Sequence, residues 1–253
     1  MESDIKVKSL YKAIKLLDCF SVTSPERGIS ELAEMTGMLK STVHNIVTTF
    51  EKCRILEKIP DNNKYRLGLK ILQLGNSFLA TNDLRNNIKP FLDRISNISS
   101  ENVYFVVLSD DEVLYLDAVY PNAFTTGRTV TGKKAPLFCT GVGKAILANL
   151  IPEDIKRIIS EGMPRFTPNT ITDENKLMEE LALIKSRGYA IDNMEHEYGI
   201  KCVAVPLFNS RGNVVAAISV SGPSLRFSDD KINEYAELLL KVSEDIKGIF
   251  KYD

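Results

Sequence analysis

The stretch from residue 28 to residue 67 restricts the possible folds more than any other part of the chain. Two short amphipathic patterns are separated by Gly37, and two short strand-like runs follow on either side of residues 61–63. This order predicts a helix, a turn, a second helix and a β-hairpin. In the second helix, expected over residues 40–53, apolar side chains recur at i, i+3, i+4 and i+7, which predicts one inward face. These side chains are Val43, Ile46, Val47 and Phe50. We therefore expect a winged helix-turn-helix domain.

The opposite face of this second helix is polar and nearly uncharged. It has hydroxyl, amide and imidazole side chains after a lysine at its start, namely Lys40, Ser41, Thr42, His44, Asn45, Thr48 and Thr49. Solvated helices usually carry Glu and Lys instead, whereas short hydrogen-bonding groups suit base edges and phosphates in a major groove. We predict that this helix contacts DNA through Lys40, Ser41, Thr42, His44 and Asn45. Three cations of the hairpin are expected to lie along phosphates, namely Lys58, Lys64 and Arg66.

Length and composition allow one large domain or two ordinary ones, because the chain has 253 residues, of which 44% are hydrophobic. No apolar run approaches the roughly 20 residues that span a bilayer, and the N-terminus lacks the apolar core of a signal peptide, so a cytoplasmic protein is expected. The four cysteines lie far apart, which argues against a zinc site or a disulfide scaffold. Residues 1–70 carry a net charge of +3 and the remainder −4. This asymmetry fits a nucleic-acid-binding head on a sensing body.

The rest of the chain predicts a connector and a second domain. Helical patterns occupy residues 69–79 and 84–98, and the second is expected to break near Pro90. Further strands are expected at 103–108, 113–119, 128–130, 189–192, 201–208 and 214–221, and further helices at 142–150, 152–160, 173–187 and 228–250. Strands around grouped helices predict an α+β domain with a mainly antiparallel sheet flanked by helices. We thus expect a winged helix-turn-helix domain over residues 1–68, a connector helix over 69–82 and a second domain over 83–253.

Two features of the second domain suggest a ligand cavity, and the first is a strand face of small residues. In the strand at residues 214–221, Ile218 and Val220 point to one face, while Ser219 and Ser221 point to the other. The neighbouring strand repeats the pattern, with Cys202 and Ala204 on its small face. This face suits a cavity that offers hydroxyl groups. A tightly packed second layer, with the serine hydroxyls bonded to the backbone, explains the pattern equally well.

The second feature is the expected helix start at residues 140–144, Thr-Gly-Val-Gly-Lys. Thr140 can cap this helix, and the small residues leave backbone N–H groups open to a carboxylate or phosphate. The motif is not a nucleotide P-loop, which needs Gly at position 138 and Ser or Thr at position 145. If this helix start and the small face share a cavity, its expected occupant is a small organic acid with hydroxyl or keto groups. Asp192 would then accept a hydrogen bond from a ligand hydroxyl or bind through water, and it is otherwise a solvated turn carboxylate.

The chain contains few of the residues from which catalytic sites are usually built. It has two histidines, His44 and His196, and His44 belongs to the face expected to contact DNA, so neither a metal cluster nor a Ser/His site is expected. Cys202 and His196 remain as a nucleophile and a base, but nothing else in the sequence points to an activated thiol. The sequence therefore predicts a protein that is not an enzyme and uses neither a metal nor a cofactor.

Four motifs, in this order and spacing, make the chain resemble IclR-type bacterial transcriptional regulators over essentially its whole length. They are ISELAEMTGMLKSTVHNIVTTFEK, CTGVGKAILANL, RGYAIDNMEHEYGIKCVAVPLF and AAISVSGPSLRFS. The resemblance implies a winged helix-turn-helix head, a GAF-like effector domain, and dimers that pair on DNA or associate into tetramers. It also implies that a small metabolite, often a carboxylic acid, tunes the affinity for the operator.

The resemblance also implies where the effector is bound. The family's effector contacts fall on Gly141, Val142, Asp192, Cys202, Ser219 and Ser221. Ala135 and Gly127 match positions that line the family's pocket, and both are small, which implies a roomier cavity than in members that sense two- and three-carbon acids. Three positions depart from the family pattern and bear on which effector and operator are recognised. Phe138 stands where many members have His, Asn45 where many have Arg, and Met194 where an acidic residue usually follows Asp192.

Three hypotheses follow for the function. The first is a dimeric or tetrameric transcription factor, a repressor, that reads a palindromic operator and responds to a small carboxylic acid. The second is a metabolite-binding protein whose winged-helix head contacts another protein. Replacing Thr42 and His44 with alanine separates these two, because it abolishes operator binding only under the first. The third, a thiol enzyme, requires Cys202 for turnover.

Overall fold

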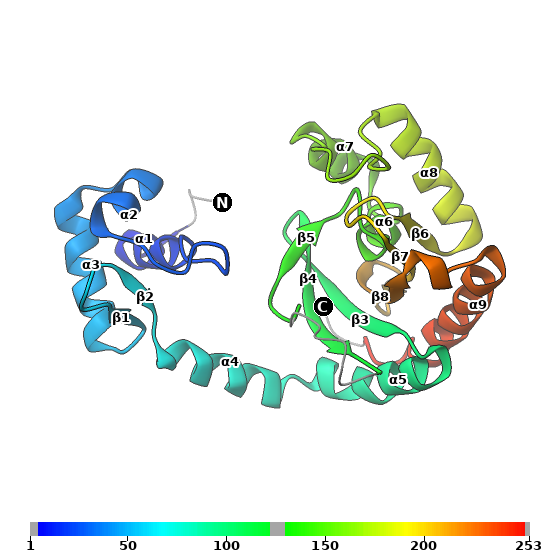
Figure 1. Cartoon of the computed structure of the whole chain (residues 1–253), viewed down its shortest axis with the longest axis horizontal. Coiled ribbons are helices and arrows are strands. Elements are labelled where there is room, and N and C mark those ends of the chain that lie inside the picture. The colour runs from blue at the N-terminus through cyan, green and yellow to red at the C-terminus, as the bar shows by residue number, and fades with distance from the viewer. Residues whose placement is uncertain (1–4, 122–129, 251–253) are drawn as a thin grey trace. The chain divides into compact units, whose positions relative to one another are not determined.

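The computed structural model describes residues 5–121 and 130–250. The chain divides into two compact units, a first unit over Met1–Asn82 and a second unit over Asp83–Asp253 (Figure 1). Among the described residues, no helix is both long enough and apolar enough to cross a membrane.

The first unit has the element order that its sequence predicts. Its elements are α1 (Lys8–Leu17), α2 (Ile29–Thr36), α3 (Lys40–Lys52), β1 (Leu56–Lys58), β2 (Tyr65–Leu67) and α4 (Leu69–Thr81). Leu16 of α1, Leu32 of α2 and Val43 of α3 are fully buried and meet in one apolar cluster. The three helices therefore share a core, and the helix, turn, helix and hairpin prediction is confirmed.

Local backbone geometry explains the two turns of this unit. Gly37 ends α2 with a φ of 68°, a left-handed conformation that glycine adopts without strain. In the hairpin, β1 and β2 pair antiparallel, with Leu56 opposite Leu67. The Asn62 side chain accepts a hydrogen bond from the Lys64 N–H at 2.9 Å, which fixes the turn between the strands. The hairpin thus forms the wing beside α3.

The second unit is an antiparallel sheet flanked by helices. Its strands are β3 (Asn102–Ser109), β4 (Glu112–Val119), β5 (Lys134–Pro136), β6 (Ala190–Asn193), β7 (Ile200–Phe208) and β8 (Val214–Pro223). Its helices are α5 (Asp83–Ser99), α6 (Gly141–Leu147), α7 (Pro152–Ser160), α8 (Glu174–Arg187), the short 3₁₀ helix η2 (Ser224–Arg226) and α9 (Asp229–Asp245). Within the described residues the strands lie in the order β5-β4-β3-β8-β7-β6, with every neighbouring pair antiparallel. The predicted α+β class and mainly antiparallel sheet are confirmed.

Helices cover the two faces of this sheet differently. On one face, Phe105, Val205 and Ile218 pack with side chains of α5 and α9 in one apolar cluster. On the other face, Ala204 and Ala217 pack with side chains of α6, α7 and α8 in a second cluster (Figure 1). At the centre of β7 and β8, Val205 and Ile218 therefore point toward α5 and α9, and Ala204 and Ala217 point toward α6.

Three sequence-based boundaries are wrong. Helix α5 runs through Pro90 without a break, because the flanking Ile88 and Leu92 are fully buried and their packing offsets the lost N–H bond. Helix α6 ends at Leu147 and α9 at Asp245, earlier than predicted. The strand expected at 128–130 falls mostly outside the described residues, and the edge strand next to β4 is β5, which pairs through Ala135 with Val113.

Candidate DNA-binding face and effector site

Helix α3 turns the residues predicted to contact DNA toward solvent. Lys40, Ser41, His44 and Asn45 are exposed and Thr42 is half-buried. Val43 and Val47, on the opposite side of the helix, are fully buried in the core of the first unit. The apolar stripe therefore fixes which face of α3 remains outside. A face of hydroxyl, amide and imidazole groups on a helix that follows a tight turn can enter a major groove.

Two of the three predicted wing cations have carboxylate partners. Lys64 Nζ lies 3.2 Å from Glu31 Oε1, and Arg66 Nε lies 3.1 Å from Glu57 Oε2. All four side chains are substantially exposed, and exposed ion pairs contribute only about 0 to 1 kcal/mol. The carboxylates hold the two cations in place. Because the pairs are weak, a DNA phosphate can replace the carboxylate as the partner of each cation. Lys58 is exposed on β1.

The small-residue face of the second unit is arranged as the strand alternation predicts. Ser219 lies opposite Ala204 and Ser221 opposite Cys202 in the β7–β8 pairing. Both serines are buried, at 2% and 3% exposure. The Cys202 thiol donates a hydrogen bond to Ser221 Oγ at 3.0 Å. The Ser221 hydroxyl thus accepts a hydrogen bond from Cys202, which lies on the same small-residue face.

Helix α6 begins directly over this face. A Cβ built on Gly141 would lie 3.2 Å from the Cβ of Cys202 and 3.6 Å from the Cβ atoms of Ala204 and Asp192. The fold therefore brings together Gly141, Cys202 and Asp192, which are far apart in the sequence. Thr140 caps the helix as predicted, because its Oγ1 accepts from the Gly143 N–H at 3.0 Å.

Asp192 is a buried carboxylate and not a solvated turn residue. It is only 4% exposed, and its Oδ1 accepts from the Glu195 N–H at 2.7 Å. Burial raises the pKa of Asp192 to about 7, and the charge of the Glu195 carboxylate adds to the rise, while the hydrogen bond from the Glu195 N–H opposes it. Near neutral pH this group can therefore donate or accept a hydrogen bond, and when protonated it does not repel an anion.

An ionic network behind the face was not predicted. Lys144 of α6 is 1% exposed, and its Nζ pairs with Glu195 and lies 3.8 Å from Glu180 of α8. Glu180 is also paired with Arg187, at 3.0 Å. The second oxygen of Glu195 has no hydrogen-bond partner among the described residues, so this carboxylate depends on Lys144. The network ties α6 and α8 to the loop that follows Asp192.

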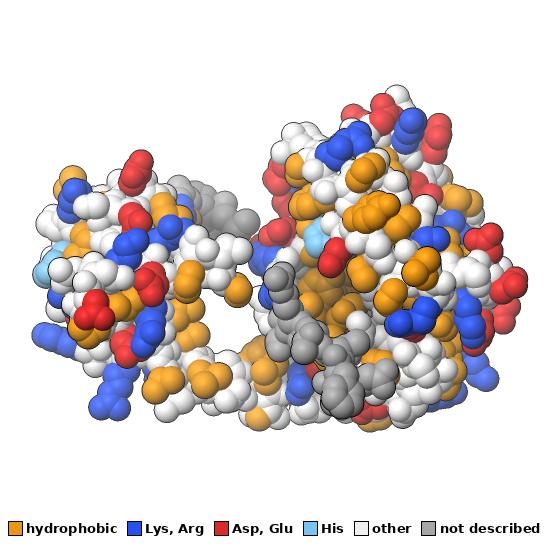
Figure 2. Space-filling model, viewed as in Figure 1, with side chains coloured by type: hydrophobic (Ala, Val, Ile, Leu, Met, Phe, Trp, Pro, Cys, Tyr) orange, Lys and Arg blue, Asp and Glu red, His pale blue; other side chains and the backbone are white. Residues whose placement is uncertain are grey.

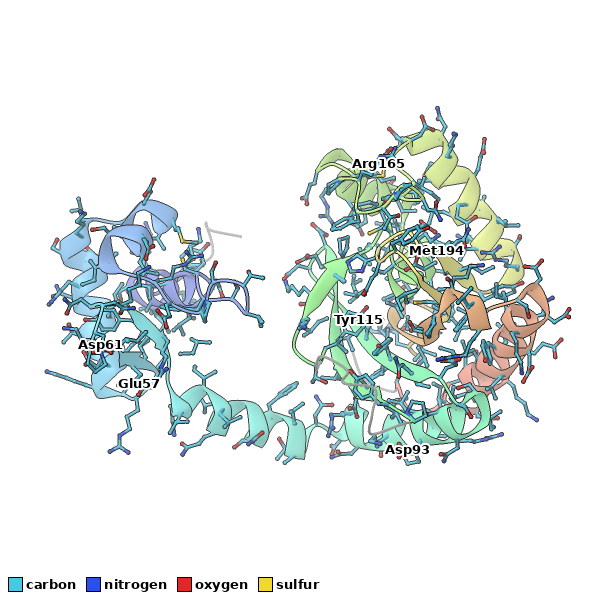
Figure 3. The ribbon with its side chains drawn as sticks, in the orientation of Figure 1. Glu57, Asp61, Asp93, Tyr115, Arg165 and Met194 are labelled. Carbon is cyan, nitrogen blue, oxygen red and sulfur yellow. The ribbon has the colours of Figure 1, made fainter. Side chains whose placement is uncertain are left out.

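Strands β3 and β4 add two tyrosines that were not among the predicted site residues. Tyr104 of β3 lies opposite Ser219, and its ring is 5.6 Å from that of Tyr115 at an interplanar angle of 90°. Burial raises the pKa of both phenols. Figure 2 shows a recess with hydrophobic side chains in the second unit, at the place where Figure 3 labels Tyr115. The alternation of Tyr104 with Val103 and Phe105 was a usable signal for its face. Tyr115 alternates with Leu114 and lies on the same face as Val113, so the same kind of signal was present in β4.

The remaining predicted site residues have different surroundings. Ala135 and Val142 are buried in the apolar cluster on the α6 side of the sheet, at 4% and 3% exposure. Phe138 is buried as well, and its ring lies 6.2 Å from that of Phe166. Gly127 lies outside the described residues.

The thiol of Cys202 lacks the surroundings of a catalytic nucleophile. Burial raises its pKa, and its hydrogen bond is donated to Ser221 and not to a base. The ring of His196 packs against Phe166 at 5.2 Å, and burial lowers the pKa of this histidine. Among the described residues, no group of three or more His, Cys, Asp or Glu side chains is placed to hold a metal ion.

Comparison with known proteins gives the family. The model for "Bacterial transcriptional regulator IclR C-terminal" matches residues 76–248, and the model for "IclR helix-turn-helix domain" matches residues 9–60. The chain belongs to the IclR family. It is a transcriptional regulator with a helix-turn-helix DNA-binding domain.

Curated IclR-family proteins match along nearly the whole chain. The HTH-type transcriptional regulator BhcR of Paracoccus denitrificans is 31% identical, with 95% of this chain and 86% of that protein covered. The transcriptional repressor IclR of Escherichia coli is 30% identical, with 95% and 89% covered. These relatives are regulators and not enzymes.

A solved IclR-family structure extends the likeness to the fold. The IclR homologue of Microbacterium hydrocarbonoxydans, solved in complex with 4-hydroxybenzoate, matches with a TM-score of 0.77 and 25% identity, over 96% of this chain and 98% of that one. That homologue carries a small aromatic acid.

Proposed function

We propose that this IclR-family regulator is a repressor that reads a palindromic operator and whose operator affinity is tuned by a small carboxylic acid. We assign residues 1–68 to DNA binding, 69–82 to the connector and 83–253 to effector binding. The observation that carries the proposal is the exposed, polar and nearly uncharged face of α3 in a matched helix-turn-helix domain. A repressor among the relatives supports the direction of regulation.

In the operator complex, α3 lies in the major groove. Ser41, Thr42, His44 and Asn45 contact base edges or phosphates from its exposed face. Lys40 contacts the backbone at the start of the helix, and the wing adds phosphate contacts through Lys58, Lys64 and Arg66. Asn45 provides an amide, which suits the paired donor and acceptor of adenine in the major groove.

Replacing Thr42 and His44 together with alanine should weaken operator binding by a factor of about 30 to 2 × 10⁴, because each of the two base contacts contributes about 1 to 3 kcal/mol. The operator is first selected from a random duplex library with the unmodified protein, and affinities are then compared by fluorescence anisotropy. The matched control, Thr172→Ala with His196→Ala, changes the same residue types in the second unit. Undiminished operator binding by the Thr42, His44 variant would favour a head that contacts another protein.

The effector lies on the small-residue face under the start of α6. Ser219, Ser221 and Cys202 offer side-chain hydrogen bonds, Gly141 and Val142 offer the backbone of α6, and Asp192 binds a ligand hydroxyl. Ala135 and Gly127 occupy little volume and so leave room for the ligand. The buried serines, the tyrosines beside them and a homologue that binds 4-hydroxybenzoate support this assignment.

A saturating acid should raise the unfolding midpoint of the protein, since a ligand at 100 times its Kd stabilises the native state by about 2.7 kcal/mol, which is roughly 5 to 10 °C for a unit of this size. The screen covers hydroxy, keto, sugar and aromatic acids, with 4-hydroxybenzoate included. The shift should disappear in Ser219→Ala with Ser221→Ala. It should persist in Ser160→Ala with Ser186→Ala, whose hydroxyls bond only to helix carbonyls. A shift that survives in the first variant would place the acid elsewhere.

Assembly into dimers or tetramers involves α4. Leu69, Leu72, Leu74 and Phe78 are 53% to 76% exposed, and no residue of α4 is buried within the single chain. Monomeric proteins rarely expose an apolar surface of this kind, so we infer that a second copy covers it. An effector that changes operator affinity tenfold supplies about 1.4 kcal/mol of coupling, which α4 transmits through the geometry of the dimer.

A further inference from the structure

A groove in the first unit lies outside all the residues assigned above except Thr42. It has a volume of about 480 Å³ and runs between α1 and the start of α3. Its walls include Lys8, Tyr11, Lys12, Lys15, Leu39 and Thr42. Every wall residue belongs to the helix-turn-helix domain, so the groove is part of the DNA-binding head.

One wall of this groove is a row of lysines. Lys8, Lys12 and Lys15 stand at i, i+4 and i+7 on α1 and are all exposed, so they share one face of the helix. Residues 5–17 contain no Asp or Glu. Within the described part of the chain, no carboxylate lies within ion-pair distance of Lys8 or Lys12, in contrast to Lys64 and Arg66 of the wing.

The other wall continues into the face that reads DNA. Thr42 lines the groove and also stands at the edge of the exposed face of α3, beside Ser41 and Asn45. The N-terminus of this 13-residue helix adds partial positive charge at the same end. A DNA strand whose bases meet α3 therefore has its neighbouring phosphates near the groove.

We propose that this groove binds the phosphate backbone of the operator, with Lys8 and Lys12 as phosphate contacts beside the base pairs that α3 reads. The proposal rests on the proposed DNA-binding function. Lys8 and Lys12 stand about one helical turn apart, roughly 6 Å along the α1 axis, on the same face of the helix. The two ammonium groups can therefore contact phosphates of the same DNA strand.

The salt dependence of DNA binding tests this contact without knowledge of the operator. The full-length protein is titrated onto a mixed-sequence 30-base-pair duplex between 50 and 200 mM potassium chloride, and the slope of log K against log salt is measured. Each lost phosphate contact reduces the magnitude of this slope by about 0.9. Lys8→Gln with Lys12→Gln should thus reduce it by about 1.8 per head and weaken binding by about tenfold per lysine at 0.1 M salt.

Two further variants separate charge at this groove from charge in general. Lys156→Gln with Lys241→Gln removes two exposed lysines of the second unit and should leave the slope unchanged. Lys8→Arg with Lys12→Arg keeps both charges and should keep the slope. A slope in the Lys8, Lys12 glutamine variant equal to that of the Lys156, Lys241 control would overturn the inference while leaving DNA binding by α3 intact. A native protein with no salt-dependent binding would overturn both.

Discussion

Replacing Lys144 with methionine should lower the free energy of unfolding of the second unit by about 3 to 5 kcal/mol, because it leaves a buried carboxylate without its cation. Lys144 is 1% exposed and is the ion-pair partner of Glu195, whose other oxygen has no partner among the described residues. Glu180 retains Arg187, so the loss falls mainly on Glu195. Urea denaturation followed by far-UV circular dichroism measures the change.

The double variant Lys144→Met with Glu195→Gln is the matched control. It removes both charges, and well-packed neutral replacements of buried ion pairs are often close to neutral in stability. It should therefore recover most of the lost stability, giving a positive coupling energy in the double-mutant cycle. If the double variant were as unstable as Lys144→Met alone, the packing of the lysine stem and not its charge would be the stabilising feature.

Gly143→Ala should destabilise the same unit by at least about 3 kcal/mol. The added Cβ would lie 2.4 Å from Thr140 Oγ1, 2.6 Å from the Leu137 carbonyl oxygen and 2.7 Å from the Leu137 Cα. The backbone cannot give way without loss of the hydrogen bond from the Gly143 N–H to Thr140 that begins α6. Because Gly141 lies in the same turn, the displacement should also weaken effector binding, which thermal shift with a hit acid measures.

Gly248→Ala is the control for this substitution. No atom lies within 4 Å of a Cβ built on Gly248, so its unfolding free energy should change by no more than about 0.5 kcal/mol. A Gly143→Ala protein as stable as this control would mean that the turn before α6 can shift at little cost. The close contacts around Gly143 would then not require glycine at this position.

Local patterns were sufficient for most of the fold. The 3.6-residue periodicity of α3 identified Val43 and Val47 as core residues, and the two-residue periodicity of β8 placed Ile218 and Ser219 on opposite faces. Both patterns depend only on neighbours along the chain, which is why they can be read from the sequence. Pro90 was misjudged, because packing of α5 against the sheet outweighs a local signal.

The candidate effector site was predicted only in part. Gly141, Asp192 and Cys202 were chosen from local patterns and a family resemblance, and the fold brings these three together. Tyr115 was missed although it shares the face of Val113, because strand alternation gives the face of a side chain and not which strands lie beside it in the sheet. The pairing of Lys144 with Glu195 was missed because these residues are 51 positions apart. No local sequence pattern relates one to the other.

By itself, the sequence determined the class of most elements, the faces that α3 and β8 bury, and the kind of protein to which they belong. Hydrophobic periodicity and turn residues act over a few positions, so these properties are local. Only the tertiary structure decided that Asp192 is buried with its pKa raised to about 7, and that α1 lines a cationic groove beside α3. Burial and charge pairing depend on which distant segments meet, and that is set by the packing of the whole unit.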